Sequence, residues 1–347
     1  MRFSLDDPEG ALRGVRLRHE SEISRPDLTY EFERTAGCDA APWRLRLPRP
    51  DVDRFEYQFE LTGADGGKRS VCDPANPRRA PGPFGEKSVV EFPEYRPPAW
   101  LDGPNADAPR GRVRRTEVQS RALRSAVEVW LWSSPGSRSR ARLPLLLVHD
   151  GPEYARYSAL LEMLDRLTAT GALPPMRAAL LGPGRRNRNY SASAAYVRAL
   201  VADLLPAVRA LAPYAGLPVG MGSSLGALAV LHAQRSHPGL LAAMFLQSGS
   251  FFRPATGDAR FDFTRTRRIT RFVGDVLGGR AWEDPVPVVM TCGAHEMNLA
   301  NNRAMRDALS LQGYDVRLHE GRDLHSWIAW RDLLDPHLVA LLRRVWT

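Results

Sequence analysis

Residues 218–234, PVGMGSSLGALAVLHAQ, decide how the second half of this chain folds. The stretch begins as a short apolar strand, turns at Gly-Ser-Ser-Leu-Gly (222–226) and continues as a helix rich in alanine and leucine. Glycines two residues before and two residues after Ser224 remove side chains that would clash in a tight strand-to-helix turn. This arrangement is typical of a nucleophile elbow, which exposes its serine at the edge of a sheet. The alternative is that Ser223 or Ser224 only caps the helix.

Short apolar strands alternate with helical segments on both sides of this turn. Parallel strands covered on both faces read as near-continuous apolar runs, and strand–helix alternation predicts such a sheet. We therefore expect an α/β fold with a mostly parallel sheet and helices on both faces. The expected strands are 126–132, 143–150, 177–184, 217–222, 242–249, 286–293 and 314–321, and the clearest amphipathic helices are 158–170 and 196–211.

The first third of the chain has a different pattern. Clusters of β-forming residues are separated by Gly, Pro and Asp, at 28–35, 43–50, 53–63 and 87–93. Dense proline and glycine at 73–83 and recurring prolines at 93–109 indicate a surface loop and a linker. The sequence therefore predicts a small β-sandwich with its linker at 1–108, followed by a catalytic domain at 109–347.

Function in open α/β sheets collects in the loops at the carboxyl ends of strands. A serine there needs a base that is oriented by an acid, and in this sheet type the chain order is serine, acid, histidine. His325 follows the last expected strand and opens the next helix, so it is the expected base, with His295 as the competitor. The loops to examine are 149–151, 185–190, 248–250, 293–298 and the loop ending at 325.

Glu296 is the expected acid. It is the only acidic residue between Asp284 and Asp307, and it follows an expected strand. A glutamate at this place can alternatively serve only to favour a helix N-terminus. Asp323, two residues before His325, is the other candidate for the acid.

An oxyanion hole needs two N–H donors near the nucleophile. The N–H of Leu225, directly after Ser224 at a helix N-terminus, is one expected donor. The second should come from the loop after the strand at 143–150, where Gly151, Glu153 and Tyr154 are the candidates. Pro152 is excluded because proline has no N–H.

Four further side chains are candidates for substrate binding. Arg186 and Arg188 follow another expected strand, and a guanidinium can grip a carboxylate, a phosphate or a catecholate oxygen. Trp327 and Trp330, just beyond His325, could form the wall of a pocket for an aromatic group. The alternatives are a solvated loop for the arginines and core packing for the tryptophans.

Composition limits the class of protein. The chain has 347 residues and a net charge of +9, with 17 basic and 20 acidic side chains in residues 1–110 and 31 and 19 in the rest. A basic second half suits an anionic partner, yet no nucleic-acid-binding motif accompanies it.

Because we see no secretory leader and no membrane-spanning run, we expect a cytoplasmic protein. Three dispersed cysteines suggest free thiols. Without a metal-ligand set we expect no cofactor.

Several motifs together resemble one family. Residues 114–347 resemble the enterochelin esterase-like α/β-hydrolases of the esterase D-type superfamily in the words LLLVHDGPEY, RNRNY, GSSLGALA, LQSGSFF, CGAHEMNLANNRAM and HSWIAWRDLL. The region before them resembles the immunoglobulin-like early-set domain that precedes such esterases. One departure is Ala227, where a second glycine often follows the elbow.

The resemblance implies a serine esterase that cleaves a cyclic catecholate siderophore ester, often iron-loaded. Ser224 would be the nucleophile, His325 the base and Glu296 the acid, with Arg186 and Arg188 matching arginines of the family. An acyltransferase with the same triad is one alternative. A non-catalytic binding protein on a hydrolase scaffold is another. The sequence leaves open whether the chain forms a homodimer.

Overall fold

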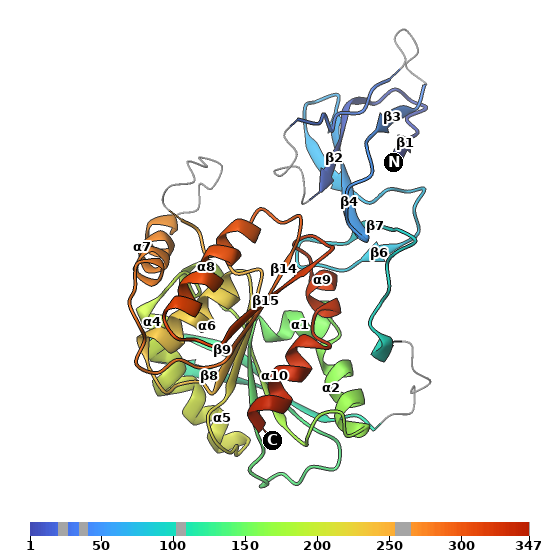
Figure 1. The fold of residues 1–347 in the computed structure, drawn as a ribbon. Helices are drawn as coiled ribbons and strands as arrows, with labels where there is room; N and C mark the ends of the chain where they lie inside the picture. The colour runs from blue at the N-terminus through green and yellow to red at the C-terminus, as the bar shows by residue number, and fades with distance from the viewer. Residues whose placement is uncertain (20–26, 35–40, 102–108, 254–264, 347) are drawn as a thin grey trace. The chain divides into compact units, whose positions relative to one another are not determined.

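The computed structural model describes residues 1–19, 27–34, 41–101, 109–253 and 265–346 (Figure 1). The chain forms two compact units. The N-terminal unit is Met1–Arg96 together with the short segments Gly293–Met297 and Arg322–Ala329, and the large unit is the remainder from Pro97 onward. The boundary predicted at residue 108 falls among residues 102–108, outside the described residues, and stays a prediction.

The N-terminal unit is built on antiparallel strands. β1 pairs with β3, and a second sheet has the order β2-β4-β7-β6, with β5 paired to β4. The strands are β1 (Arg2–Leu5), β2 (Leu12–His19), β3 (Trp43–Arg46), β4 (Arg54–Gly63), β5 (Lys68–Val71), β6 (Arg79–Ala80) and β7 (Lys87–Glu91). Alternating buried positions along β1 and β3 supply one face of the core.

Aromatic side chains fill the core of this unit. The rings of Phe3 and Tyr57 meet edge to face at 5.0 Å, and those of Phe32 and Phe59 at 5.1 Å. The strands predicted at 43–50, 53–63 and 87–93 contain β3, β4 and β7, whereas β1, β2, β5 and β6 were not predicted, and β6 lies in the stretch expected to be a surface loop. In the segment predicted at 28–35, the described residues form only isolated bridges, at Glu31 and Glu33. The immunoglobulin-like topology stays a prediction.

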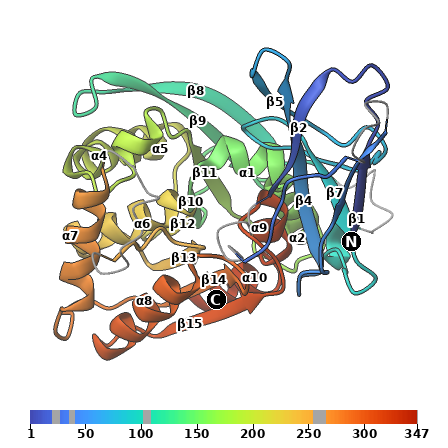
Figure 2. The same ribbon diagram turned by 90° about the horizontal axis from the view of Figure 1, so that it is seen from above.

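The large unit contains an eight-stranded sheet with the order β15-β14-β13-β12-β10-β11-β9-β8, which Figure 2 shows from above. Five adjacent strands of this sheet, β10 to β14, run parallel to one another. β9 is antiparallel to both β8 and β11. The strands are β8 (Arg112–Ser120), β9 (Ser125–Ser133), β10 (Leu145–His149), β11 (Arg177–Leu181), β12 (Val219–Ser223), β13 (Ala243–Gln247), β14 (Val288–Gly293) and β15 (Val316–Gly321).

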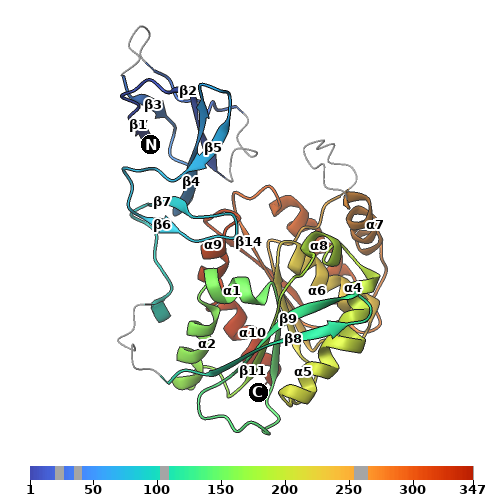
Figure 3. The same ribbon diagram turned by 180° about the vertical axis from the view of Figure 1, so that it is seen from behind.

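Helices cover both faces of this sheet. Opposite views agree that α1, α2 and α10 lie on one side and α4 to α8 on the other (Figures 1 and 3). The elements are η2 (Ala99–Leu101), α1 (Gly151–Tyr157), α2 (Leu160–Ala169), α3 (Arg186–Asn189), α4 (Ala194–Ala199), η3 (Leu200–Leu204), α5 (Leu205–Leu211), α6 (Leu225–Ser236), α7 (Thr266–Leu277), α8 (Leu299–Leu311), α9 (Trp327–Asp332) and α10 (His337–Trp346). The helix predicted at 196–211 is one run in which the π-turn η3 joins α4 to α5.

Burial explains why the sequence indicated these strands. Every residue of β10, β11, β12 and β13 is buried, as expected for parallel strands covered on both faces. The α/β fold with a mostly parallel sheet and helices on both faces is confirmed. Within the part of the chain that the structure describes, no helix combines the length and the apolar character that crossing a membrane requires.

Candidate active site

Ser224 occupies the sharp turn between β12 and α6. Its backbone has φ 54° and ψ −119°, a conformation that residues other than glycine rarely adopt. A Cβ at Gly222 would lie 2.5 Å from the backbone carbon of Gly226, so only glycine fits where the strand passes the first turn of the helix. The structure thus has the strained strand-to-helix geometry that the glycine spacing predicts. The side chain of Ser224 makes no capping hydrogen bond to α6, so helix capping does not explain it.

The contacts of Ser224 come from the strand next to its own. Its N–H donates to the carbonyl of Gln247 at 2.8 Å, and its own carbonyl accepts from the N–H of Ser250 at 3.1 Å. The hydroxyl oxygens of Ser224 and Ser250 lie 3.1 Å apart, within hydrogen-bonding distance. The turn is therefore fixed through the loop that follows β13.

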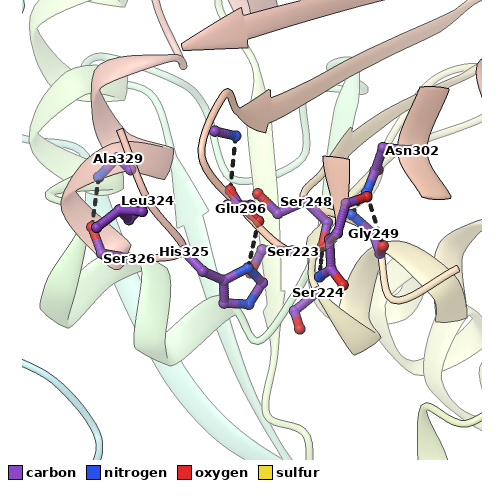
Figure 4. A network of polar contacts seen from close by, with 12 residues as sticks. Ser223, Ser224, Ser248, Gly249, Glu296, Asn302, Leu324, His325, Ser326 and Ala329 are labelled. Atoms are coloured by element: carbon purple, nitrogen blue, oxygen red, sulfur yellow. Dashed lines mark hydrogen bonds and ion pairs between the residues drawn. The ribbon is translucent and has the colours of Figure 1, made fainter. Parts of the chain in front are cut away.

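The loop after β13 is itself held by buried polar side chains, which Figure 4 shows in part. Asn302 accepts a hydrogen bond from the N–H of Gly249 at 2.9 Å and donates to its carbonyl at 3.0 Å. The indole of Trp330 donates to the hydroxyl of Ser248 at 2.9 Å. The amide of Gln247 accepts from the Tyr154 hydroxyl at 2.7 Å and donates to the Trp330 carbonyl at 3.0 Å.

Sequence reasoning marked residues 248–250 as an edge loop but gave them no role. It missed Gln247 and Asn302 altogether. The register of the sheet, which pairs Ser223 with Gln247, brings these residues to the elbow. A buried glutamine at the end of an apolar strand was the one available signal, since buried polar side chains are normally hydrogen-bonded.

The two expected oxyanion donors both begin helices. Leu225 is the first residue of α6 and Gly151 the first of α1, and the first N–H groups of a helix have no partner within it. A Cβ at Gly151 would lie 2.3 Å from Cα of Leu180, so a glycine is required there. The N–H of Tyr154 donates to the carbonyl of Asp150 at 3.0 Å, which removes Tyr154 from the candidates. Glu153 stays a candidate.

Arg186 is engaged by a carboxylate of the protein itself. Its Nε and Nη2 donate to the two oxygens of Asp150 at 2.9 and 2.7 Å. Asp150 is buried and directly precedes Gly151, so this pair braces the loop that carries one expected oxyanion donor. About a third of the Arg186 side chain remains exposed. Arg188 is exposed, and its carbonyl accepts a hydrogen bond from Arg268 at 2.7 Å.

His325 and Glu296 form a close pair within the N-terminal unit. Nδ1 of His325 lies 2.7 Å from Oε2 of Glu296 (Figure 4). The other carboxylate oxygen accepts from the N–H of Gly293 at 2.8 Å. The Glu296 side chain is only 1% exposed, whereas that of His325 is 27% exposed. A carboxylate that accepts from Nδ1–H leaves Nε2 of the ring able to take a proton.

The two alternatives contact other groups. Nε2 of His295 lies 3.9 Å from a carboxylate oxygen of Asp51, and its side chain is 39% exposed. Oδ1 of Asp323 accepts a hydrogen bond from the N–H of Leu324 at 2.7 Å. Trp327 begins α9 and is half-buried. Among the described residues no group of three or more His, Cys, Asp or Glu side chains is arranged to hold a metal ion.

The fold is that of the α/β-hydrolases. The enterochelin esterase from Shigella flexneri superposes with a TM-score of 0.80 at 22% identity over all of this chain and 93% of that one. A structure of the Shigella flexneri enterobactin esterase in the presence of enterobactin gives a TM-score of 0.77 at 21% identity over 99% and 92% of the two chains. At these identities the likeness shows the fold.

A protein of known sequence gives a second comparison. The iron(III) enterobactin esterase of Dickeya dadantii (strain 3937) is 30% identical over 244 residues, which are 67% of this chain and 56% of that protein. The match thus spans little more than half the length of the relative. No family model matches the chain. The resemblance to enterochelin esterase-like α/β-hydrolases is confirmed.

Proposed function

We propose that the protein is a serine esterase whose nucleophile is Ser224, with His325 as base and Glu296 as acid. The strained backbone of Ser224 at the start of α6 is the observation that carries this proposal most. The 2.7 Å contact between His325 and Glu296 supports it, because a buried carboxylate would hold the imidazole in the tautomer a base needs. Ser224, Glu296 and His325 also follow one another along the chain in the order serine, acid, histidine, which is the order of the triad residues in α/β-hydrolases.

The proposed reaction has two halves. Ser224 Oγ attacks the ester carbonyl while Nε2 of His325 takes its proton, and the N–H of Leu225 with one from Gly151 stabilises the oxyanion. The tetrahedral intermediate collapses, His325 gives the proton to the leaving alkoxide, and an acyl-enzyme remains. Water, deprotonated by His325, then releases the acid and restores Ser224.

The substrate class we propose is an ester of a catecholate siderophore. The names of the relatives support this choice, since they act on enterobactin and one of them on its iron(III) complex. The basic character of residues 111–347 suits such an anionic substrate. Iron would enter as part of the substrate.

The first prediction concerns Ser224. Replacing Ser224 by alanine should lower kcat for a catecholate trilactone by at least about 10⁴-fold, because loss of the nucleophile removes the triad as a unit. Hydrolysis products separated by chromatography give the rate. Ser236→Ala, at the exposed end of the same helix, is the matched control and should keep wild-type turnover. Turnover by Ser224→Ala within tenfold of wild type would overturn the proposal.

A further inference from the structure

The segment that carries His325 is built into the N-terminal unit, although it follows the last strand of the large sheet in the chain. We propose that Leu324 and Arg322 are positioning residues for the proposed catalytic base, His325. Leu324 anchors the segment that carries His325 in the core of the N-terminal unit, and Arg322 anchors that segment on the surface of the same unit. This inference rests on the proposed function, since it concerns the base of that reaction. It gives residues 1–96 a role in catalysis.

Leu324 is the stronger of the two anchors. It is 3% exposed and belongs to the apolar cluster of the N-terminal unit. Every other buried member of that cluster lies between Phe3 and Leu61, so Leu324 enters a core that a distant part of the chain has formed. Burying a leucine side chain stabilises the folded state because apolar surface is removed from water. This burial fixes the backbone directly before His325.

Polar contacts hold the segment three residues before His325, at Arg322. The N–H of Asp53 donates to the carbonyl of Arg322 at 2.8 Å. The Arg322 guanidinium donates to Asp53 at 3.0 Å and to Asp51 at 2.8 Å. Because Arg322 and Asp51 are largely exposed, these ion pairs add little, and the backbone hydrogen bond is the firmer contact.

The segment with the proposed acid is fixed to the same place. A Cβ at Gly293 would lie 2.3 Å from the carbonyl oxygen of Asp323, so the two segments pass at a distance that only glycine permits. Gly293 also donates its N–H to Glu296. Asp51 lies 3.9 Å from His295, which adds a contact between residues 1–96 and the acid segment. The N-terminal unit therefore supports both members of the His325–Glu296 pair.

The chemical consequence follows from the demands of proton transfer. A base works only within hydrogen-bonding reach of the hydroxyl that it deprotonates. Displacement by about 1 Å can cost on the order of 100-fold in rate. Loosening Leu324 should therefore lower kcat while leaving KM nearly unchanged, because substrate contacts are not removed.

The test compares two leucines of the same cluster. Leu324→Ala and Leu61→Ala remove the same side-chain atoms from one core, but only Leu324 adjoins His325. We expect Leu324→Ala to lower kcat by about 10- to 100-fold and Leu61→Ala to keep at least half of wild-type kcat at a matched loss of Tm. Leu324→Met, which refills the volume, should restore most of the rate. If Leu324→Ala does not fold, Leu324→Val against Leu61→Val makes the same comparison.

A second readout separates this inference from the esterase proposal. The Nδ1–H proton of His325, bonded to Glu296, should resonate far downfield in a ¹⁵N-histidine-labelled sample, with His325→Gln assigning it. The signal should be lost or shifted in Leu324→Ala and retained in Leu61→Ala. An unchanged signal in Leu324→Ala, or equal losses in both variants, overturns the positioning role. An active Ser224→Ala enzyme would refute the proposed reaction without touching this result.

Discussion

Three residues in the large unit hold a strained backbone at the ends of neighbouring strands. Asp150, Ser224 and Ser248 have φ values of 52°, 54° and 48°, and they directly follow β10, β12 and β13. Strain of this kind persists only where the surroundings impose it, and it concentrates at functional sites. At Asp150 the ion pair with Arg186 supplies the constraint, and at Ser248 the hydrogen bond from Trp330 contributes.

Single residues also show how much of the candidate site could be predicted from the sequence. The strained turn at Ser224 was predictable because the spacing of the glycines around it follows from local steric constraints. The contact between Glu296 and His325 was predicted from chain order, and the pair does lie together at 2.7 Å. Engagement of Arg186 by Asp150 was not predictable, since it depends on two loops that are 36 residues apart.

A prediction at this scale concerns His149, which ends β10. Burial lowers the pKa of His149 to about 4, so the folded protein resists its protonation. Unfolded chains take up this proton near pH 6.5, and stability is therefore lost as the pH falls from about 6.5 towards 4. Between pH 8 and pH 5 the wild type should lose about 2 kcal/mol of unfolding free energy more than His149→Gln.

Urea denaturation at the two pH values measures this difference, and the pH-independent cost of the substitution cancels. Equal losses in wild type and His149→Gln would show that His149 is not buried as a neutral ring.

Among the elements, the buried strands were the easiest to predict and β8 was missed. β10 to β13 each contain a run of four apolar or glycine residues with one polar residue at an end, which the sequence displays directly. β8 is an edge strand whose first four residues are exposed and mostly arginine, so it has neither an apolar run nor an apolar/polar alternation there. Its pairing with β9 over nine residues holds it in the sheet.

The elbow between β12 and α6 gives the prediction for this scale. Gly222→Ala should destabilise the protein by about 3 kcal/mol and abolish esterase activity, because the new Cβ meets backbone at 2.5 Å. Gly274→Ala, inside α7 with nothing within 4 Å of the new Cβ, should stabilise by about 0.5–1 kcal/mol. Thermal unfolding and turnover of both variants test the pair. A fully active and stable Gly222→Ala would show that the turn is not tight.

On the scale of the whole molecule, two short segments from the C-terminal part of the chain belong to the N-terminal unit. Ser224 belongs to the large unit, and Glu296 and His325 belong to segments of the N-terminal unit. The sequence predicted two domains by composition and periodicity. It could not predict that residues 293–297 and 322–329 would join the first unit, because Leu324 meets partners more than 260 residues earlier in the chain.

The most direct measurement of the central claim is the rate at which a fluorophosphonate labels Ser224, with the labelled peptide identified by mass spectrometry. Wild type should be labelled at Ser224 alone. Glu296→Gln should react about 10²- to 10⁴-fold more slowly, since its imidazole loses the orienting carboxylate, whereas Asp323→Asn should react within tenfold of wild type. Labelling at another residue, or an undiminished rate in Glu296→Gln, would contradict the account.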